Sequence, residues 1–217
     1  MDQAIPSPRP DTEAVAERRA RILDAAERCI VRSGFHRTTM QDVAAEAGMS
    51  PGNLYRYFRS KDMIVVGLAE RDRAQMAAEF SALENTDDFV QAFARLGRKH
   101  FEEEPRERAI LCLQIWAEAV RNPGFAALTG DFEREFVARV AQLLAAAQKR
   151  GAVSTASEPE AIARVIAAFA DGLFVRRAIA PDFDPKREVD HIMKVIGALL
   201  DGTISLSNDK RSNGALS

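Results

Sequence analysis

A short segment near the N-terminus carries the side chains with the clearest potential for recognition chemistry. Residues 50–58 include a small residue, an amide, a guanidinium and a phenol, which are Gly52, Asn53, Arg56 and Tyr57. Amide and guanidinium groups form the hydrogen bonds that distinguish base edges in a DNA major groove, whereas hydroxyls and cations contact phosphates. This set suits a short helix that enters a groove, provided that the four side chains share one exposed face.

The flanking residues predict the helix-turn-helix that such a face needs. Thr38 and Thr39 are each followed three residues later by a capping partner, which indicates the start of a first short helix. Gly48 supplies the turn, and Ser50 caps a second helix with Pro51 at its first position. We expect seven or eight residues in each helix. On these residues alone, an αα-hairpin within a helical core remains the alternative. The side chains expected to pack inward are Val43, Leu54 and Phe58.

The run from Arg19 to Lys61 resembles the DNA-binding domain of the TetR family of bacterial transcriptional regulators. Tyr57 departs from the family pattern, in which histidine is more frequent, but a phenol and an imidazole can each donate to a phosphate. The resemblance implies a DNA-binding regulator whose remaining helices bind a ligand and form a homodimer. The shared motifs are I-L-x-A-A at 22–26, G-F at 34–35, T-T at 38–39, V-A-x-x-A-G-x-S at 43–50 and G-x-L-Y-x-Y-F-x-x-K at 52–61.

The resemblance also implies two sets of DNA contacts. The positions that look like phosphate contacts are Thr39, Tyr55, Tyr57 and Lys61, with Thr38 beside them. The positions that look base-facing are Gly52, Asn53 and Ser50, with Arg56 between the two sets. In the first helix, three arginines either add backbone contacts or form a solvated face, and the sequence leaves both open. These arginines are Arg18, Arg19 and Arg21.

The rest of the chain is predicted to be helical. Apolar residues recur at helical spacing, and β-branched alternation is nowhere sustained over five residues. We expect an all-α fold of about nine helices, with a three-helix DNA-binding domain followed by a helical body. The expected divisions are a disordered arm over 1–14, the DNA-binding domain over 15–61, the ligand-binding and dimerisation domain over 62–202 and a disordered tail over 203–217. Starts or caps of helices are expected at Val15, Ser60, Thr86, Pro105, Glu158 and Lys186, and the helix that begins at Pro105 is expected to stop at Asn122-Pro123.

A single short recognition helix reads only a few base pairs. Specific binding then needs two copies about 34–36 Å apart, which predicts a homodimer on a palindromic operator. The last two expected helices have wide apolar stripes and are the predicted interface, although they could instead only complete the monomer core. The stripes contain Ile162, Val165, Ile166, Phe169, Leu173, Phe174, Ile192, Val195, Ile196, Leu199 and Leu200, and the small residues are Ala163, Ala167, Ala170 and Gly172.

Aromatic residues and a few polar residues within apolar stripes predict an effector pocket in the body. Asp171 is a polar residue within the apolar stripe of the eighth expected helix. We expect a small, mainly apolar effector to release the DNA by favouring a conformation with a different spacing of the two recognition helices. The resemblance favours a repressor, with an activator as the alternative. The candidate lining residues are Phe93, His100, Gln114, Trp116, Glu118, Phe136 and Phe169.

Composition and motifs argue against other classes of protein. Residues 17–61 contain nine Lys and Arg against five Asp and Glu, a balance of +4 within a chain of net charge −2, which favours a basic segment that binds a polyanion. The sequence contains no phosphate loop, no HExxH and no GxSxG, so we expect no enzyme activity, no cofactor and no metal, with a helical enzyme or an interaction module as remote alternatives. Its two cysteines and the lack of a long apolar run predict a reduced, soluble, cytoplasmic protein.

Overall fold

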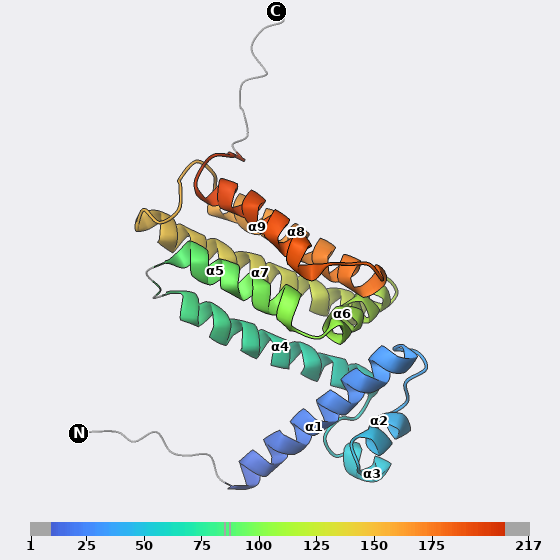
Figure 1. The fold of residues 1–217 in the computed structure, drawn as a ribbon. Coiled ribbons are helices and arrows are strands. Elements are labelled where there is room, and N and C mark those ends of the chain that lie inside the picture. The colour runs from blue at the N-terminus through green and yellow to red at the C-terminus, as the bar shows by residue number, and fades with distance from the viewer. Residues whose placement is uncertain (1–9, 85, 87, 207–217) are drawn as a thin grey trace, which may run out of the picture. The chain divides into compact units, whose positions relative to one another are not determined.

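The computed structural model describes residues 10–84, 86 and 88–206, and within these ranges it contains helices and no strand (Figure 1). The all-α prediction is therefore confirmed. Residues up to Asp72 form one compact unit and residues from Arg73 onward form another, so α4 belongs to both. The elements are α1 (Pro10–Ser33), α2 (Met40–Glu46), α3 (Pro51–Leu54), α4 (Lys61–Glu84), α5 (Phe89–Arg98), the π-helix η1 (Lys99–Glu103), α6 (Arg106–Ala119), α7 (Pro123–Lys149), α8 (Pro159–Ile179) and α9 (Pro185–Leu200).

The first unit packs α1, α2, α3 and the first half of α4 around one apolar core. Gly67 on α4 lies in close contact with neighbouring core side chains, because an added Cβ would stand 2.9 Å from Cε1 of Phe58 and 3.1 Å from Cδ2 of Leu23. This close contact explains why the unit extends to Asp72, eleven residues beyond the expected boundary at 61. The fully buried core side chains include Ile22, Ile30, Val43, Leu54, Ile64 and Leu68.

Three features of this unit differ from the expectations. The first helix begins at Pro10 rather than Val15, and residues 1–9 of the expected arm lie outside the described residues. α3 has four residues instead of seven or eight, although Tyr57 and Phe58 still donate their backbone N–H groups to the Leu54 carbonyl. The N-cap of α2 is Thr39 alone, because the Thr38 hydroxyl donates to the Gly34 carbonyl instead.

The helix after α4 also starts and ends differently from the prediction. Its N-cap is Asp88, whose carboxylate accepts from the Gln91 N–H, and not Thr86. At its C-terminus the helix widens into η1, where Glu104 donates its N–H to the Lys99 carbonyl across five residues. A π-turn of this kind changes the direction of the following side chains, and such turns occur frequently at functional sites.

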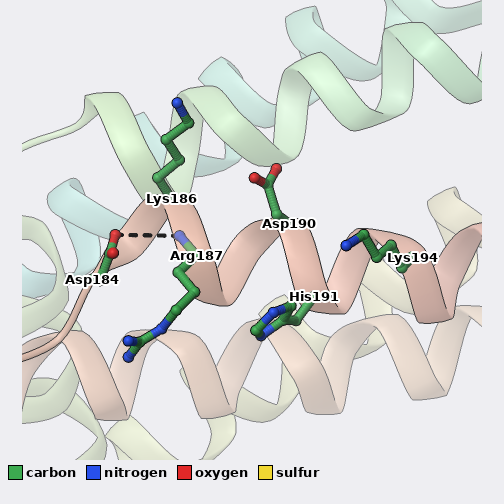
Figure 2. A pocket seen from close by; sticks show the side chains of 6 residues that line it. All are labelled: Asp184, Lys186, Arg187, Asp190, His191 and Lys194. Atoms are coloured by element: carbon green, nitrogen blue, oxygen red, sulfur yellow. Dashed lines mark hydrogen bonds between the residues drawn. The ribbon is translucent and has the colours of Figure 1, made fainter.

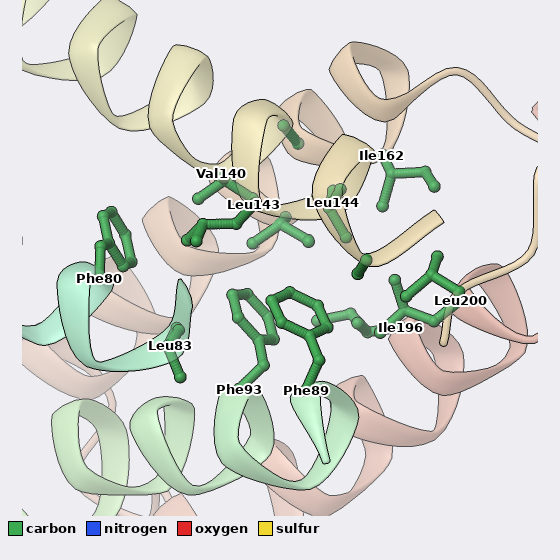
Figure 3. Packing of buried hydrophobic residues seen from close by; sticks show 14 of the residues in the cluster. Phe80, Leu83, Phe89, Phe93, Val140, Leu143, Leu144, Ile162, Ile196 and Leu200 are labelled. Carbon is green, nitrogen blue, oxygen red and sulfur yellow. The ribbon is translucent and has the colours of Figure 1, made fainter. Parts of the chain in front are cut away.

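The second unit has a core that α4, α5, α7, α8 and α9 share (Figure 3). Figure 1 shows α5 and α7 between the second half of α4 and the pair α8–α9. No helix within the described ranges is long and apolar enough to cross a membrane. Core side chains labelled in Figure 3 are Phe80, Leu83, Phe89, Phe93, Val140, Leu143, Leu144, Ile162, Ile196 and Leu200.

Many residues of the apolar stripes of α8 and α9 belong to the core of the subunit itself. Ile162 and Ala163 are fully buried within the subunit, and Leu199 is 2% exposed. α8 runs from Pro159 to Ile179, close to the expected range of 158–178, and Asp171 lies within it as an exposed residue. Of residues 203–206, which are predicted to belong to the disordered tail, Ser205 and Leu206 are hydrogen-bonded to the α7–α8 connection, and residues 207–217 lie outside the described residues. The bonds run from Ser205 Oγ to the Ala156 carbonyl and from the Leu206 N–H to Ser157 Oγ.

Candidate nucleic-acid interface and effector region

The predicted recognition helix is held at its start by a local cap. Ser50 Oγ accepts from the Asn53 N–H at 3.3 Å, and Pro51 occupies the first helical position. Gly52 and Arg56 are exposed, Asn53 is half-buried, and Tyr55 is 45% exposed. Since Leu54 and Phe58 are buried on the opposite side, α3 and the turn after it present a short polar face on a rigid support.

The first helix supports the far end of this face. An Nη of Arg18 lies 3.3 Å from the Tyr57 hydroxyl, and this hydrogen bond raises the pKa of Arg18. The guanidinium of Arg19 lies 4.5 Å from the centre of the Phe58 ring and donates to the Tyr57 carbonyl. Arg18 and Arg19 therefore contact the recognition turn itself, whereas Arg21 is exposed on the solvated face.

A capping box fixes the start of α2. Thr39 Oγ1 accepts from the Asp42 N–H at 3.2 Å, and Asp42 Oδ2 accepts from both the hydroxyl and the N–H of Thr39. These hydrogen bonds from Thr39 lower the pKa of Asp42. Thr39 remains exposed, whereas Thr38 is only 2% exposed. The Thr38 hydroxyl is thus turned into the protein, where it donates to the Gly34 carbonyl, and only Thr39 presents its hydroxyl to solvent.

Lys61 is hydrogen-bonded to the backbone that precedes α2. Its ammonium donates to the carbonyl oxygens of Phe35 and Thr38, the latter at 2.9 Å, and lies 4.1 Å from the centre of the Phe35 ring. The structure thus forms two groups of predicted DNA contacts. One group is on α3 and its turn, with Ser50, Gly52, Asn53, Tyr55, Arg56 and Tyr57, and the other is at the start of α2, with Thr39 and Lys61.

The predicted effector residues do not form one set. Phe93 is 8% exposed and belongs to the main core of the second unit, and Phe136 and Phe169 pack against that core. Phe136 also lies against Phe80, with 5.7 Å between the ring centres. These three phenylalanines are therefore core side chains in this conformation.

Trp116 belongs to a second aromatic cluster. Its ring centre lies 6.1 Å from that of Phe174, and the ring centre of Phe101 lies 5.0 Å from that of Phe174. All three rings are half-buried and come from η1, α6 and α8. Edge-to-face clusters of this kind provide apolar surface together with negative ring faces. Gln114 and Glu118 are half-buried on the same helix as Trp116.

His100 lies in a cluster of charged side chains. Nε2 is 2.7 Å from Glu79 Oε2 and Nδ1 is 3.1 Å from Glu104 Oε1. Burial lowers the pKa of His100, but the hydrogen bonds and charges of Glu104 and Glu79 outweigh it, so the net shift is upward. The sequence prediction missed both carboxylates. The spacing of four residues between His100 and Glu104 was a detectable signal, whereas Glu79 comes from another helix.

Arg177 completes this cluster from α8. It is 7% exposed, and its guanidinium donates to the carbonyl oxygens of His100 and Glu104. Burial lowers the pKa of Arg177. Arg106 in turn donates to the carbonyls of Arg177 and Ala178, so the end of α8 is bonded to both η1 and α6.

Two surface hollows of the second unit involve α9, and neither is lined by a predicted effector residue. The first, of about 280 Å³, is polar and formed by α9 and its N-cap (Figure 2). The dashed line in Figure 2 marks the hydrogen bond that the Arg187 N–H donates to the carboxylate of Asp184, the N-cap residue of α9. The second, of about 390 Å³, lies between α5 and α9, and its lining includes Val90, Ala94 and Met193.

Comparison with known proteins places both units in one family. The family model described as "Bacterial regulatory proteins, tetR family" matches residues 22–68. The model described as "BetI-type transcriptional repressor, C-terminal" matches residues 90–201. The two matches lie on either side of the division between the units, so each unit is matched by a family model of its own.

Individual relatives agree with these matches. The transcriptional regulator UidR of Escherichia coli K12 is 30% identical over 140 residues, which are 63% of this chain and 69% of UidR. The nicotine-responsive repressor HdnoR of Paenarthrobacter nicotinovorans is 25% identical over 193 residues, covering 87% of this chain and 96% of HdnoR. A regulator from Saccharomonospora viridis, solved in complex with choline, aligns with a TM-score of 0.68 at 25% identity, covering 84% of this chain and 94% of that one.

These relatives are transcriptional regulators and not enzymes. The resemblance at residues 19–61 is thereby extended to most of the chain. The family matches and the capped helix α3 agree, and the protein is therefore a DNA-binding transcriptional regulator that belongs to the TetR family.

Proposed function

We propose that this regulator is a repressor that binds a palindromic operator as a homodimer and releases it when a small effector binds the second unit. The observation that carries this proposal is the capped recognition helix, whose polar side faces solvent while Leu54 and Phe58 anchor it. The match of residues 90–201 to a repressor C-terminal model favours repression over activation.

The proposed DNA contacts follow from exposure and hydrogen-bonding capacity. Thr39, Tyr55 and Tyr57 carry hydroxyls that can reach phosphates, whereas Asn53 can pair with an adenine edge. Gly52 allows the backbone to approach the bases, since nothing stands within 4 Å of the position of its missing Cβ. The remaining proposed contacts are Ser50, which also caps the helix, and Arg56, whose exposed guanidinium can reach either a base or the backbone.

The proposed dimer uses the exposed side of α8 and α9. On α8 this side includes Ala168, Gly172 and the 60% exposed Ile179, and on α9 it includes the 41% exposed Val195. Small residues at the centre of such a strip allow two helices to approach closely, and two helices from each subunit would form a four-helix interface. A homodimer of this kind supplies the twofold symmetry that a palindromic operator requires.

The proposed effector is a small molecule with a mainly apolar body. The cluster of Phe101, Trp116 and Phe174 supports this class, because its half-buried rings can separate around an apolar group. A cationic nitrogen is the second candidate feature, since the faces of aromatic rings attract quaternary ammonium groups and the Saccharomonospora viridis relative binds choline.

Release is proposed to be a population shift. An effector that prefers a conformation with another spacing of the recognition helices lowers the operator affinity by its differential binding to the two conformations. α4 is the proposed connection, because this single helix begins in the first unit and ends in the second.

Fluorescence anisotropy with inverted repeats from the upstream region of the protein's own gene tests the proposal. We expect two chains per duplex, an affinity that falls steeply with salt, and loss of binding when one half-site is scrambled. Choline and a neutral biaryl compound are then added separately, and the effective one is expected to raise the Kd at least tenfold. A salt-insensitive or sequence-independent interaction would contradict the proposal.

A further inference from the structure

Lys61 is the first residue of α4, and its side chain returns to the connection between α1 and α2. The ammonium donates to two backbone carbonyl oxygens, those of Phe35 and Thr38, and lies over the Phe35 ring. Carbonyl oxygens in a tight connection cannot all pair within secondary structure, so an ammonium that accommodates two of them stabilises that conformation. Lys61 therefore fixes the backbone that leads into α2.

The contact with Thr38 has a direct consequence for Thr39. The Thr38 carbonyl and the Thr39 N–H belong to the same planar peptide group. Lys61 holds the carbonyl end at 2.9 Å, and Asp42 Oδ2 holds the N–H end, also at 2.9 Å. The hydroxyl of Thr39 also donates to this carboxylate, at 2.7 Å. The position of this exposed hydroxyl thus depends on a peptide plane that Lys61 and Asp42 hold from its two ends.

We infer that Lys61 is a positioning residue for operator binding, which fixes the Thr38–Thr39 peptide and thereby the Thr39 hydroxyl, and is not itself a phosphate contact. The inference rests on the proposed function. It differs from the expectation that the resemblance gave for this lysine. In the free protein the ammonium already donates to the Phe35 and Thr38 carbonyls and contacts the Phe35 ring.

The two roles predict different salt dependences. The logarithm of the association constant falls with the logarithm of salt concentration with a slope of about −0.9 per phosphate neutralised. If Lys61 contacts a phosphate, Lys61→Met reduces the magnitude of the slope by about 0.9. If Lys61 acts through Thr39, the same variant weakens binding about tenfold and leaves the slope unchanged. Arg59→Met removes one exposed charge from the same region, and its salt slope serves as the reference for the loss of a positive charge that contacts no phosphate.

A double-mutant cycle separates positioning from a general loss of stability. Thr39→Val is expected to weaken operator binding about tenfold in the wild-type background and less than twofold in the Lys61→Met background, because the hydroxyl is no longer held in place there. Lys61→Arg, which keeps the charge and can donate to both carbonyls, is expected to retain most of the affinity. If Lys61→Met does not fold, Lys61→Gln, whose amide can donate to one carbonyl, takes its place. Additive effects in the cycle, or a slope reduced by about 0.9, would overturn the inference.

Amide exchange of the free protein provides a readout that does not depend on DNA. We expect the Thr39 N–H, which donates to Asp42, to exchange at least tenfold faster in Lys61→Met than in Arg59→Met, while the amides of α1 keep their protection. Equal exchange at Thr39 would overturn the inference even if the wild type bound no operator. Failure of the wild type to bind any inverted repeat, with faster exchange at Thr39, would count only against the proposed function.

Discussion

Nε2 of His100 lies 2.7 Å from Oε2 of Glu79, and the other ring nitrogen of His100 lies 3.1 Å from Oε1 of Glu104. A neutral imidazole can donate from only one of its nitrogens, so two carboxylates are satisfied together only by the imidazolium. Because Arg177 donates to the carbonyl of His100, this bridge joins α4, the π-helix and α8. Lys99 and Gln75 also donate to Glu79, and Arg108 pairs with Glu104.

The bridge predicts a pH-dependent stability of the second unit. The pKa of His100 is raised above its ordinary value of 6.5, so its contribution is complete below that value and is lost as pH rises through the folded-state pKa. Burial raises the pKa of Glu79, but bonds from Lys99 and His100 outweigh it, and the bond from His100 lowers the pKa of Glu104. These carboxylates contribute above their ordinary value of 4.5 and lose their effect as pH falls through their lowered pKa values.

We therefore expect His100→Gln to destabilise the protein most between about pH 5 and 6, by about 2 kcal/mol, and progressively less toward pH 9. Denaturant unfolding across this range measures the difference. His191→Gln is the matched control, since His191 is exposed on α9. A difference between wild type and His100→Gln that stays constant from pH 5 to pH 9 would show that the imidazolium does not stabilise the fold.

The contact at Gly67 predicts a second effect on stability. Gly67→Ala places a Cβ 2.9 Å from the Phe58 ring and 3.1 Å from Leu23, so the core of the first unit must shift at a cost of about 1–3 kcal/mol. Thermal unfolding monitored by circular dichroism measures this cost. Gly52→Ala is the control for stability, because nothing lies within 4 Å of its added Cβ. Equal melting temperatures for the two variants would contradict the tight packing.

The proposed dimer predicts that one large side chain on α8 separates the subunits. Gly172 is exposed and has open space around its missing Cβ, so Gly172→Arg is expected to leave the subunit folded and to shift the protein from dimer to monomer at micromolar concentration. Light scattering coupled to size exclusion measures the mass. Ala126→Arg adds the same side chain at an exposed position of α7 and is expected to remain dimeric. A monomeric wild type, or a dimeric Gly172→Arg, would remove α8 from the proposed interface.

Features that depend on a few neighbouring residues could be predicted from the sequence. The caps at Thr39 and Ser50 need partners only three residues away, so their spacing specified them. The choice between Thr38 and Thr39 was harder, because Thr38 finds its partner at Gly34 in the preceding turn. Which of two adjacent threonines caps α2 therefore depends on how the chain folds back after α1.

Features that depend on distant partners could not be predicted. The π-helix is accompanied by the pairing of His100 with Glu79, which lies 21 residues earlier on another helix. The stripes of α8 and α9 predicted burial correctly, but periodicity does not say whether a subunit's own core or a partner covers a stripe. Side chains such as Ile162 and Leu199 are covered by the core of their own subunit.

The last prediction concerns the base-facing side of α3. Asn53 is the amide that we propose reads a base, since its backbone N–H donates to the Ser50 cap and its neighbour Leu54 is fully buried. Asn53→Ala is expected to lose about 1–3 kcal/mol of discrimination at one position of each half-site, while the slope of affinity against salt stays that of the wild type, because no charge is removed. Anisotropy titrations against duplexes substituted at each half-site position locate the effect, and Arg56→Ala, which removes a charge from the same face, provides the comparison. A uniform loss across all duplexes would mean that Asn53 supports the helix and does not read a base.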